Sequence, residues 1–284
     1  MTSSTLWKAL WISAVVATAH LPGGNAIASG GPSQDASLDA CGARNLPAAR
    51  AKARRLVRQI RDDLAAVEDQ IRRARFVRAV EAGTASIEQV AAVAAEEYSI
   101  IRSDLNSFTQ MASRWDSAQG SHFFGDLASG EALSLPLVLA FAANVGLDEH
   151  DLAVYEPRPL AQTYPSRVAW IASNADRASA AASFLVNFAV FGENMGRIRD
   201  ALISVYGFTP AQIEFFSFFA EPVPGFEDDA LEVIAAGLLE GACPVDIRRS
   251  PRLLQAYELE FWQSASDPPG SHLPVVFPAR TVTR

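Results

Sequence analysis

The sequence predicts an all-α fold, a bundle of about seven to nine helices in a single domain. From Leu46 onward, apolar residues recur every three or four positions, which is the period of one face of an α-helix. No alternation of apolar and polar residues that is long enough for a β-strand occurs before residues 273–276. Of the 284 residues, 49% are hydrophobic and 20% are charged, so the chain can bury a large core. We assign residues 46–266 to the helical domain, 1–45 to a leader or disordered extension and 267–284 to a Pro-rich tail.

The first 45 residues differ in composition from the rest of the chain. Lys8 precedes an apolar run over residues 9–19, and Ala26-Ile27-Ala28 then fits a signal-peptidase cleavage motif. An unstructured extension, or a start codon assigned too far upstream, gives the same pattern. The apolar run is too short to anchor the chain across a membrane. We expect a cytoplasmic protein, or a secreted one if this segment is a true signal peptide.

Charge and residue counts exclude several classes of protein. Acidic residues outnumber basic ones by 32 to 24, and the net charge of −8 disfavours a general nucleic-acid binder. Two cysteines are too few for a disulfide scaffold, a four-cysteine zinc site or an iron–sulfur cluster. If the leader directs export, Cys41 and Cys243 can pair. We expect no metal, no cofactor, no nucleic-acid partner and no membrane span, and we consider a homo-oligomer possible.

The first predicted helix is amphipathic and basic. Its apolar face is a row with steps of three and four residues: Leu56, Ile60, Leu64, Val67, Ile71 and Ala74. Residues 44–81 carry eleven Lys/Arg and five Asp/Glu, a local charge of +6. A solvated face explains this charge better than nucleic-acid binding, because no turn and recognition helix follow it.

The remaining elements follow from caps, breakers and periodicity. Ser86 is a typical N-cap, and the helix after it carries an apolar row from Ile87 to Trp115. Residues 121–130, including His122, are predicted to form a loop. Residues 180–192 contain only Ser183 and Asn187 as polar side chains, so their helix is expected at the centre of the bundle. The other helices are predicted at residues 135–144 with Pro136 in the first turn, 148–154, 164–175, 178–206, from Pro210 to a stop at 221–225, 227–239 and 251–264.

Two acidic residues lie within apolar rows. Glu97 stands between Ala94 and Ile101, and Glu258 stands four residues after Leu254. A buried, unpaired carboxylate is costly, so each must be paired, protonated or used by a ligand. Pairing with one of the many arginines is the ordinary explanation for either acid alone. Both together, each beside aromatic residues, fit a cavity for a flat, basic heteroaromatic ligand.

Two other polar residues give weaker evidence of a functional role. Asp104 lies on the same side of its helix as Glu97, two turns along, and Arg102 is close enough in sequence to neutralise it. Arg158 lies in a rigid turn with two prolines, where it either grips an anion or forms part of a structural helix stop.

Five separated segments resemble TenA-like proteins, which include thiaminase II and the PQQ-synthesis oxygenase and share the haem-oxygenase-like fold. In order, these segments are Glu96–Asp104, Ala161–Tyr164, Phe184–Phe188 continuing to Arg197, Phe215-Phe216 and Tyr257–Trp262. The resemblance covers roughly residues 50–265 and implies a haem-oxygenase-like helical bundle. It implies a protein of thiamine metabolism that hydrolyses or salvages an aminopyrimidine.

The resemblance also implies roles for individual residues. Glu97 matches an aspartate that holds the aminopyrimidine ring, Tyr164 matches a pocket tyrosine, and Glu258 matches the general acid or base. We expect Glu258 and Glu97 to be catalytic. The residues expected to bind substrate are Glu97, Tyr164, Asn187, Phe188, Glu193 and Phe219.

The chain departs from the family at the nucleophile. Phe188, or Asn187 after a one-residue shift, stands where thiaminase-type members carry a cysteine, and neither can form a covalent adduct. The metal-dependent relatives hold two irons with histidines, and this chain has none between His150 and His272. An aminopyrimidine hydrolase without a cysteine nucleophile is therefore the first hypothesis. The alternative is a catalytically inactive small-molecule-binding relative, and a transcriptional regulator is third.

Overall fold

A computed structural model describes residues 40–116 and 121–267 of the chain. The predicted signal peptide and the Pro-rich tail lie outside these residues, apart from the last few positions of the leader and Asp267. The described residues form ten α-helices and one short 3₁₀-helix, and none of them is in a strand. The predicted all-α fold is confirmed.

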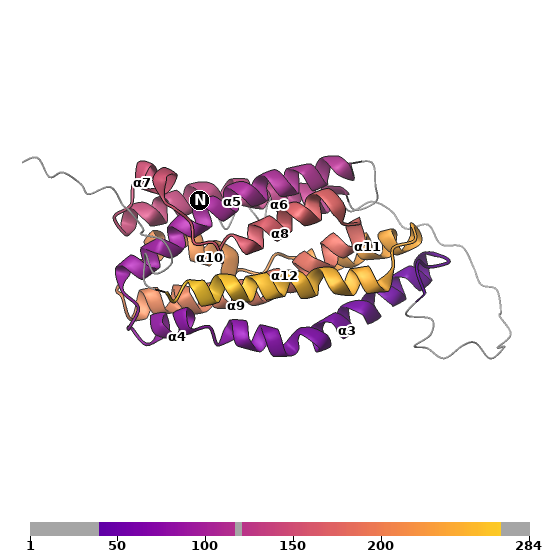
Figure 1. Ribbon diagram of the computed structural model, residues 1–284, viewed down its shortest axis with the longest axis horizontal. Helices are drawn as coiled ribbons and strands as arrows, with labels where there is room; N and C mark the ends of the chain where they lie inside the picture. Colours follow the sequence, from indigo (N-terminus) through magenta and orange to yellow (C-terminus); the bar gives the residue numbers. More distant parts are fainter. Residues whose placement is uncertain (1–39, 117–120, 268–284) are drawn as a thin grey trace, which may run out of the picture.

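The helices keep the labels of Figure 1. In chain order they are α3 (Leu46–Arg72), α4 (Arg75–Glu81), α5 (Ile87–Arg114), α6 (Ser121–Asn144), α7 (Glu149–Val154), α8 (Thr163–Asn174), α9 (Arg177–Ser204), η1 (Pro210–Ile213), α10 (Glu214–Ala220), α11 (Phe226–Leu239) and α12 (Pro244–Ser264).

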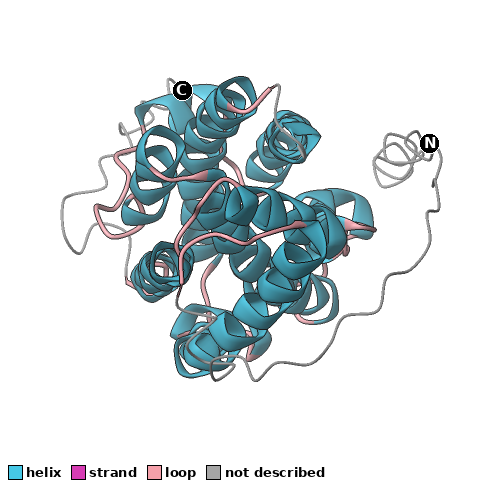
Figure 2. Ribbon diagram, turned by 90° about the vertical axis from the view of Figure 1, so that its right-hand side faces the viewer, coloured by secondary structure: helices cyan, strands magenta, loops and turns pink. Residues whose placement is uncertain are grey.

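The long helices run along the long axis of the molecule, and Figure 2 views the bundle from one end. Helix α9 packs against α3, α4, α10, α11 and α12, as expected for its apolar composition. Helix α5 packs against α6 and α8, which lie with it along the upper side of Figure 1. The N-caps Ser86 of α5 and Asp176 of α9 accept hydrogen bonds from backbone N–H groups of the first turn. A cavity lies between these two groups of helices.

The predicted loop at residues 121–130 is wrong, because α6 runs unbroken from Ser121 to Asn144. Phe123, Phe124 and Leu127 are buried at helical spacing, and packing of this face outweighs the low helix propensity of glycine. His122 therefore lies in the first turn of α6 and is exposed. Pro136 lies inside the helix on its exposed side, rather than in a first turn.

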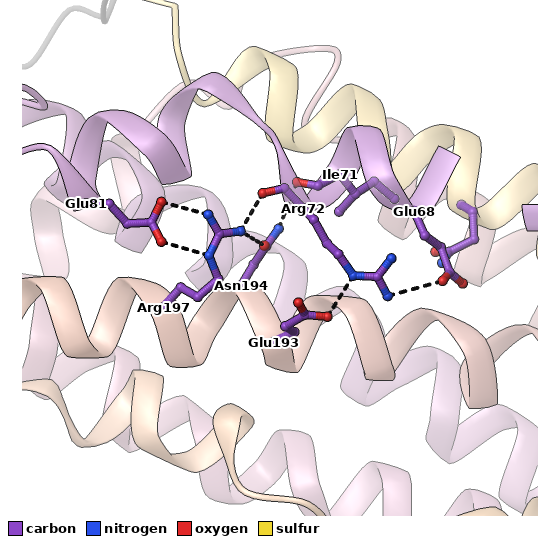
Figure 3. Close-up of polar contacts among 8 residues, drawn as sticks. Glu68, Ile71, Arg72, Glu81, Glu193, Asn194 and Arg197 are labelled. Atoms are coloured by element: carbon purple, nitrogen blue, oxygen red, sulfur yellow. Dashed lines mark hydrogen bonds and ion pairs between the residues drawn. The ribbon is translucent and has the colours of Figure 1, made fainter. Parts of the chain in front are cut away.

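Two other helix boundaries differ from the prediction. Helix α12 begins at Pro244, and Pro251 lies inside it, because Ile247, Ser250 and Leu254 continue one buried face across the proline. The first helix ends at Arg72, before the predicted last apolar residue, Ala74. Asn194 Nδ2 of α9 donates to the Ile71 carbonyl at 3.1 Å, so a side chain satisfies a backbone group at the helix end (Figure 3).

The N-terminal end of the described chain is fastened to its C-terminal half. A disulfide joins Cys41 to Cys243, the N-cap residue of α12. The Gly42 N–H donates to the Ala242 carbonyl at 2.9 Å. Lys52 Nζ donates to the carbonyl of Gly42 at 3.0 Å. These contacts hold the start of the described chain against the turn between α11 and α12.

Several basic residues of α3 are engaged in ion pairs. Arg50 pairs with Glu232 at 2.8 Å, and Arg61 pairs with Glu227 at 3.0 Å, both across to α11. These arginines join two helices on a solvated surface. The pairing supports the structural explanation of the local positive charge.

One segment within the described residues, His122–Asn144 of α6, is long and apolar enough to cross a membrane by length and composition. The same helix packs against α5 and carries the buried carboxylate of Glu131. We interpret α6 as a bundle helix with a partly exposed apolar face, and the expectation of no membrane span stays a prediction.

Candidate active site

A cavity of about 1180 Å³ opens between α5, α6, α8, α9, α10, α11 and α12. Its inner part lies among buried residues, and its outer part reaches the exposed segment of residues 221–225 between α10 and α11. All seven predicted site residues line this cavity: Glu97, Tyr164, Asn187, Phe188, Glu193, Phe219 and Glu258. Their proposed roles are not decided by this position alone.

Helix α5 supplies two of the acids in the inner part. Glu97 and Asp104 lie seven residues apart, two turns of one helix, so both project toward the cavity. Only 3% of Glu97 and 2% of Asp104 is exposed. The Oδ1 atom of Asp104 has no hydrogen-bond partner, although it is buried. Arg102, which the sequence offered as its counterion, lies 5.2 Å over the Tyr98 ring instead, and Asp104 has no ion pair among the described residues.

Two further acids come from other helices. Glu131 of α6 is 8% exposed and accepts a hydrogen bond from Ser134 Oγ at 3.4 Å. Glu258 of α12 is 2% exposed and accepts from Trp262 Nε1 at 2.7 Å and from Asn187 Nδ2 at 3.2 Å. Four carboxylates from three helices therefore converge on the inner cavity.

Burial and mutual repulsion favour the protonated forms of these acids. Desolvation raises the pKa of Glu258 to about 7, although the donors Asn187 and Trp262 oppose the shift. Desolvation likewise raises the pKa of Glu131 to about 8. The pKa of Glu97 and that of Asp104 are raised well above their usual ranges by burial first and by the neighbouring carboxylates second. Such groups can hold or release a proton near neutral pH.

A chain of hydrogen bonds fixes Glu258 relative to the cavity wall. The Tyr164 hydroxyl donates to Asn187 Oδ1 at 3.2 Å, and Asn187 Nδ2 donates both to Glu258 and to Gln255 Oε1, the latter at 3.0 Å. Burial raises the pKa of Tyr164, so its phenol stays neutral and remains a donor. Asn187 is 1% exposed and joins α8, α9 and α12 through these bonds. This arrangement leaves Asn187 in a positioning role.

Phenylalanines line the outer part of the cavity. Phe188 stacks with Phe226 at a centroid distance of 5.8 Å, and Phe191 meets Phe219 edge to face at 5.3 Å. Phe188 lines the cavity wall without closing it. Gly192 brings α9 close to α10, because a Cβ atom there would lie 2.8 Å from the Phe219 carbonyl oxygen.

Glu193 lies at the outer edge of the cavity, where 48% of its side chain is exposed. Figure 3 shows its carboxylate accepting from Arg72 Nε at 2.8 Å. Arg72 also pairs with Glu68, at 3.4 Å. Glu193 is thus held by an ion pair between α3 and α9, and its predicted binding role has no support from a buried position.

Glu96 is buried like its neighbour Glu97 but has a different environment. It accepts from the Tyr155 hydroxyl and the Arg158 N–H, each at 2.8 Å, and from Gln162 Nε2 at 3.1 Å. Arg158 Nη1 lies 3.7 Å from the same carboxylate, and Arg158 is 6% exposed. These contacts support the structural alternative for the Arg158 turn. The contrast shows that the chain satisfies a buried acid where no cavity faces it.

Sequence reasoning missed Glu131 and gave Asp104 too little weight. Glu131 follows the segment that was predicted as a loop, so no helical register was available for it. The seven-residue spacing from Glu97 was the available signal for Asp104.

No free thiol replaces the missing nucleophile. Cys41 and Cys243 are joined to each other, and neither lines the cavity. Within residues 40–116 and 121–267, no group of three His, Cys, Asp or Glu side chains has an arrangement that could hold a metal ion.

Residues 61–209 match the model of the TENA/THI-4/PQQC family. Solved structures with the same fold have low sequence identity. A TenA homologue from Pseudomonas syringae pv. tomato is 12% identical, with a TM-score of 0.64, and the match covers 79% of this chain and 97% of that one.

Two further solved structures are similar to this chain in fold. A domain of unknown function with a haem-oxygenase-like fold from Shewanella denitrificans is 18% identical over 73% of this chain and 90% of that chain, with a TM-score of 0.57. A TenA-like thiaminase, so described, from Sulfolobus solfataricus is 13% identical over 78% and 98%, with a TM-score of 0.51. A search of curated proteins gave no match. At these identities the neighbours establish the haem-oxygenase-like fold.

Proposed function

Because the chain belongs to the TENA/THI-4/PQQC family, we propose that it binds an amino-substituted nitrogen heteroaromatic in this cavity and hydrolyses it. One observation carries the proposal: four buried carboxylates, Glu97, Asp104, Glu131 and Glu258, line one cavity without a basic partner among the described residues. A basic, planar ring with an exocyclic amino group supplies the donors and the charge that these acids need.

Each residue has a part in the proposed reaction. Glu97 and Asp104 accept hydrogen bonds from the amino group and the protonated ring, while Phe188 and Phe261 line the apolar walls. Water attacks the ring carbon that bears the amino group, and the carbon–nitrogen bond breaks. Glu258 takes the proton from water and delivers it to the leaving ammonia, and the ring keeps the oxygen.

A specific observation favours the alternative, a relative that binds without catalysis. No cysteine lines the cavity, so the covalent route of thiaminase-type members is closed to this chain. Direct attack by water depends wholly on positioning and on the carboxylates. Binding and turnover must therefore be measured separately.

The test uses purified protein and 4-amino-2-methylpyrimidine. Binding raises the melting temperature, and catalysis releases ammonia. The Glu258→Gln variant is expected to lose about 10²–10⁴-fold in rate, while Glu260→Gln, two residues along the same helix, serves as a matched control. Binding without ammonia supports the inactive alternative, and no thermal shift with any aminopyrimidine contradicts both.

The expectations about macromolecular partners stay proposals. The acidic net charge and the paired arginines of α3 support the absence of a nucleic-acid partner. DNA binding at low salt that weakens as salt rises would support the regulator hypothesis instead. The partly exposed leucines of α6, Leu135, Leu137 and Leu139, support a homo-oligomer, which light scattering of the purified protein tests.

A further inference from the structure

The cavity is larger than a single ring requires. Small-molecule pockets usually enclose about 300–1,000 Å³, and this one encloses about 1180 Å³. Its four buried carboxylates occupy only the inner portion, which residues of α5, α6 and α12 line. The outer portion of the cavity therefore has room for a further part of the ligand.

The outer portion is a corridor of aromatic side chains. We define the aromatic corridor as Phe188, Phe191, Phe218, Phe219 and Phe226. All five rings are only partly buried and line the cavity, and they form three ring contacts: Phe188 with Phe226, Phe191 with Phe219, and Phe218 with Phe219. Pro222, Val223 and Pro224 continue this apolar lining to the surface. A ligand that covers these rings gains apolar burial at each of them.

The charge of the lining selects against anions. Eight carboxylates line the cavity, and the single basic side chain among its lining residues, Arg61, is paired with Glu227. In the inner portion the Oδ1 atom of Asp104 lacks a partner, and the Glu97 carboxylate accepts no hydrogen bond from the described residues. A cationic donor satisfies both groups, whereas a carboxylate or phosphate finds no unpaired basic side chain among the lining residues.

We propose that the ligand is an amphiphilic amine, with a cationic amino head between Glu97 and Asp104 and a long apolar body along the aromatic corridor. The inference rests on the proposed function for the head and extends it to a chain or a second ring system. The inner carboxylates fix the orientation of the ligand, because its apolar end cannot supply the hydrogen bonds that these buried groups need.

The test is a calorimetric titration near neutral pH with three series of probes, each used below its micelle concentration. The first is 4-amino-2-methylpyrimidine and its 5-alkyl derivatives, the second is n-alkylamines, and the third is fatty acids of matched length. Kd is expected to fall about fourfold per added methylene until the corridor is filled. The fatty acids are expected to bind at least tenfold more weakly than the amines.

Two variants locate the apolar body. Phe219→Ala is expected to remove most of the gain from the chain, and Phe219→Leu to keep part of it. Trp170→Ala, an exposed aromatic of α8 outside the cavity, is the control. If the bare ring binds and alkyl chains add nothing, the inference is overturned and the proposed function stands. If alkylamines bind and no aminopyrimidine does, the proposed function fails and the amphiphilic ligand survives.

A second inference comes from the disulfide, which is independent of the cavity. Cys41 and Cys243 are the only cysteines of the chain, and they are joined. Protein disulfides persist mainly in oxidising compartments. The apolar run and the Ala26-Ile27-Ala28 motif precede Cys41 in the order of a secretory signal and its cleavage site.

With the disulfide added to the leader, we infer that the protein is exported, the second of the two locations considered from the sequence, and that the disulfide forms after export. Two thiols lose two protons and two electrons to a thiol–disulfide oxidase of that compartment, and one sulfur–sulfur bond forms. When the full chain is expressed in a Gram-negative host, the protein is expected in the periplasm, shortened by its signal peptide and with no alkylatable thiol after denaturation. Val15→Asp with Val16→Asp is expected to hold it in the cytoplasm with two free thiols, while Val15→Leu is the control. Wild type in the cytoplasm with both thiols free overturns the inference.

Discussion

Replacing Glu258 by glutamine removes one titrating group and keeps the shape of the side chain. Burial raises the pKa of Glu258 from its ordinary value of 4.5 to about 7. Below pH 4.5 the group is protonated in both the folded and the unfolded chain. Between 4.5 and 7 the unfolded chain has released this proton and the folded chain has kept it, so the free energy of unfolding falls as pH rises.

The size of the effect follows from the two pKa values. The interval from 4.5 to about 7 corresponds to about 3 kcal/mol of stability, at ~1.4 kcal/mol per pH unit. The glutamine variant lacks this titrating group. Its free energy of unfolding, relative to that of wild type, is therefore expected to rise by about 3 kcal/mol between acidic and mildly alkaline pH. The charge of Glu258 also raises the pKa of Glu97. Removing this charge lowers the pKa of Glu97, which further reduces the loss of stability as pH rises.

Urea unfolding followed by circular dichroism measures this difference. Free energies are compared at about pH 5 and about pH 8.5 for wild type, Glu258→Gln and Glu260→Gln. Glu260 is half-buried on the same helix and controls for a generic loss of charge. Parallel pH profiles for wild type and Glu258→Gln would refute the argument that Glu258 titrates in a buried, uncompensated state.

Three other outcomes are expected. Reducing the Cys41–Cys243 disulfide, or replacing both cysteines by serine, is expected to lower the free energy of unfolding by about 2–5 kcal/mol in chemical denaturation, because it closes a long loop; an unchanged midpoint would contradict this. Arg158→Met leaves Glu96 without its buried counter-charge and should cost about 3 kcal/mol, whereas the exposed-pair variant Arg50→Met should cost much less by the same measurement. Gly192→Ala is expected to destabilise the protein by about 1–3 kcal/mol, since its Cβ would meet the Phe219 carbonyl, and a melting temperature equal to wild type would show that α10 moves freely.

The sequence predicted much of the helical architecture because periodicity and capping are local. Ser86 is the N-cap that the sequence predicted, and Asp148, predicted as the first residue of a short helix, is the N-cap of that helix; both make capping boxes. Two errors are the loop predicted at residues 121–130 and the helix start predicted at Pro251, where buried neighbours continue a single helix. At these positions packing outweighed propensity, which no local pattern reveals.

The candidate site was predictable only in part, for the same reason. Glu97 and Glu258 were found because each interrupts an apolar row of its own helix. Glu131 was missed with its helix. Glu193 was grouped with the pocket although Arg72, from a helix far away in sequence, holds it at the rim.

By itself the sequence determined which residues face the interior, since the face of a helix depends on the spacing of a few neighbours. Only the tertiary structure decided what lies opposite those faces. It gave Glu96 a buried arginine and left Asp104 without one, joined two cysteines 202 positions apart, and left a wide cavity beside four acids. Such pairings depend on how distant helices cross, and the free energy of a buried charge depends on those pairings.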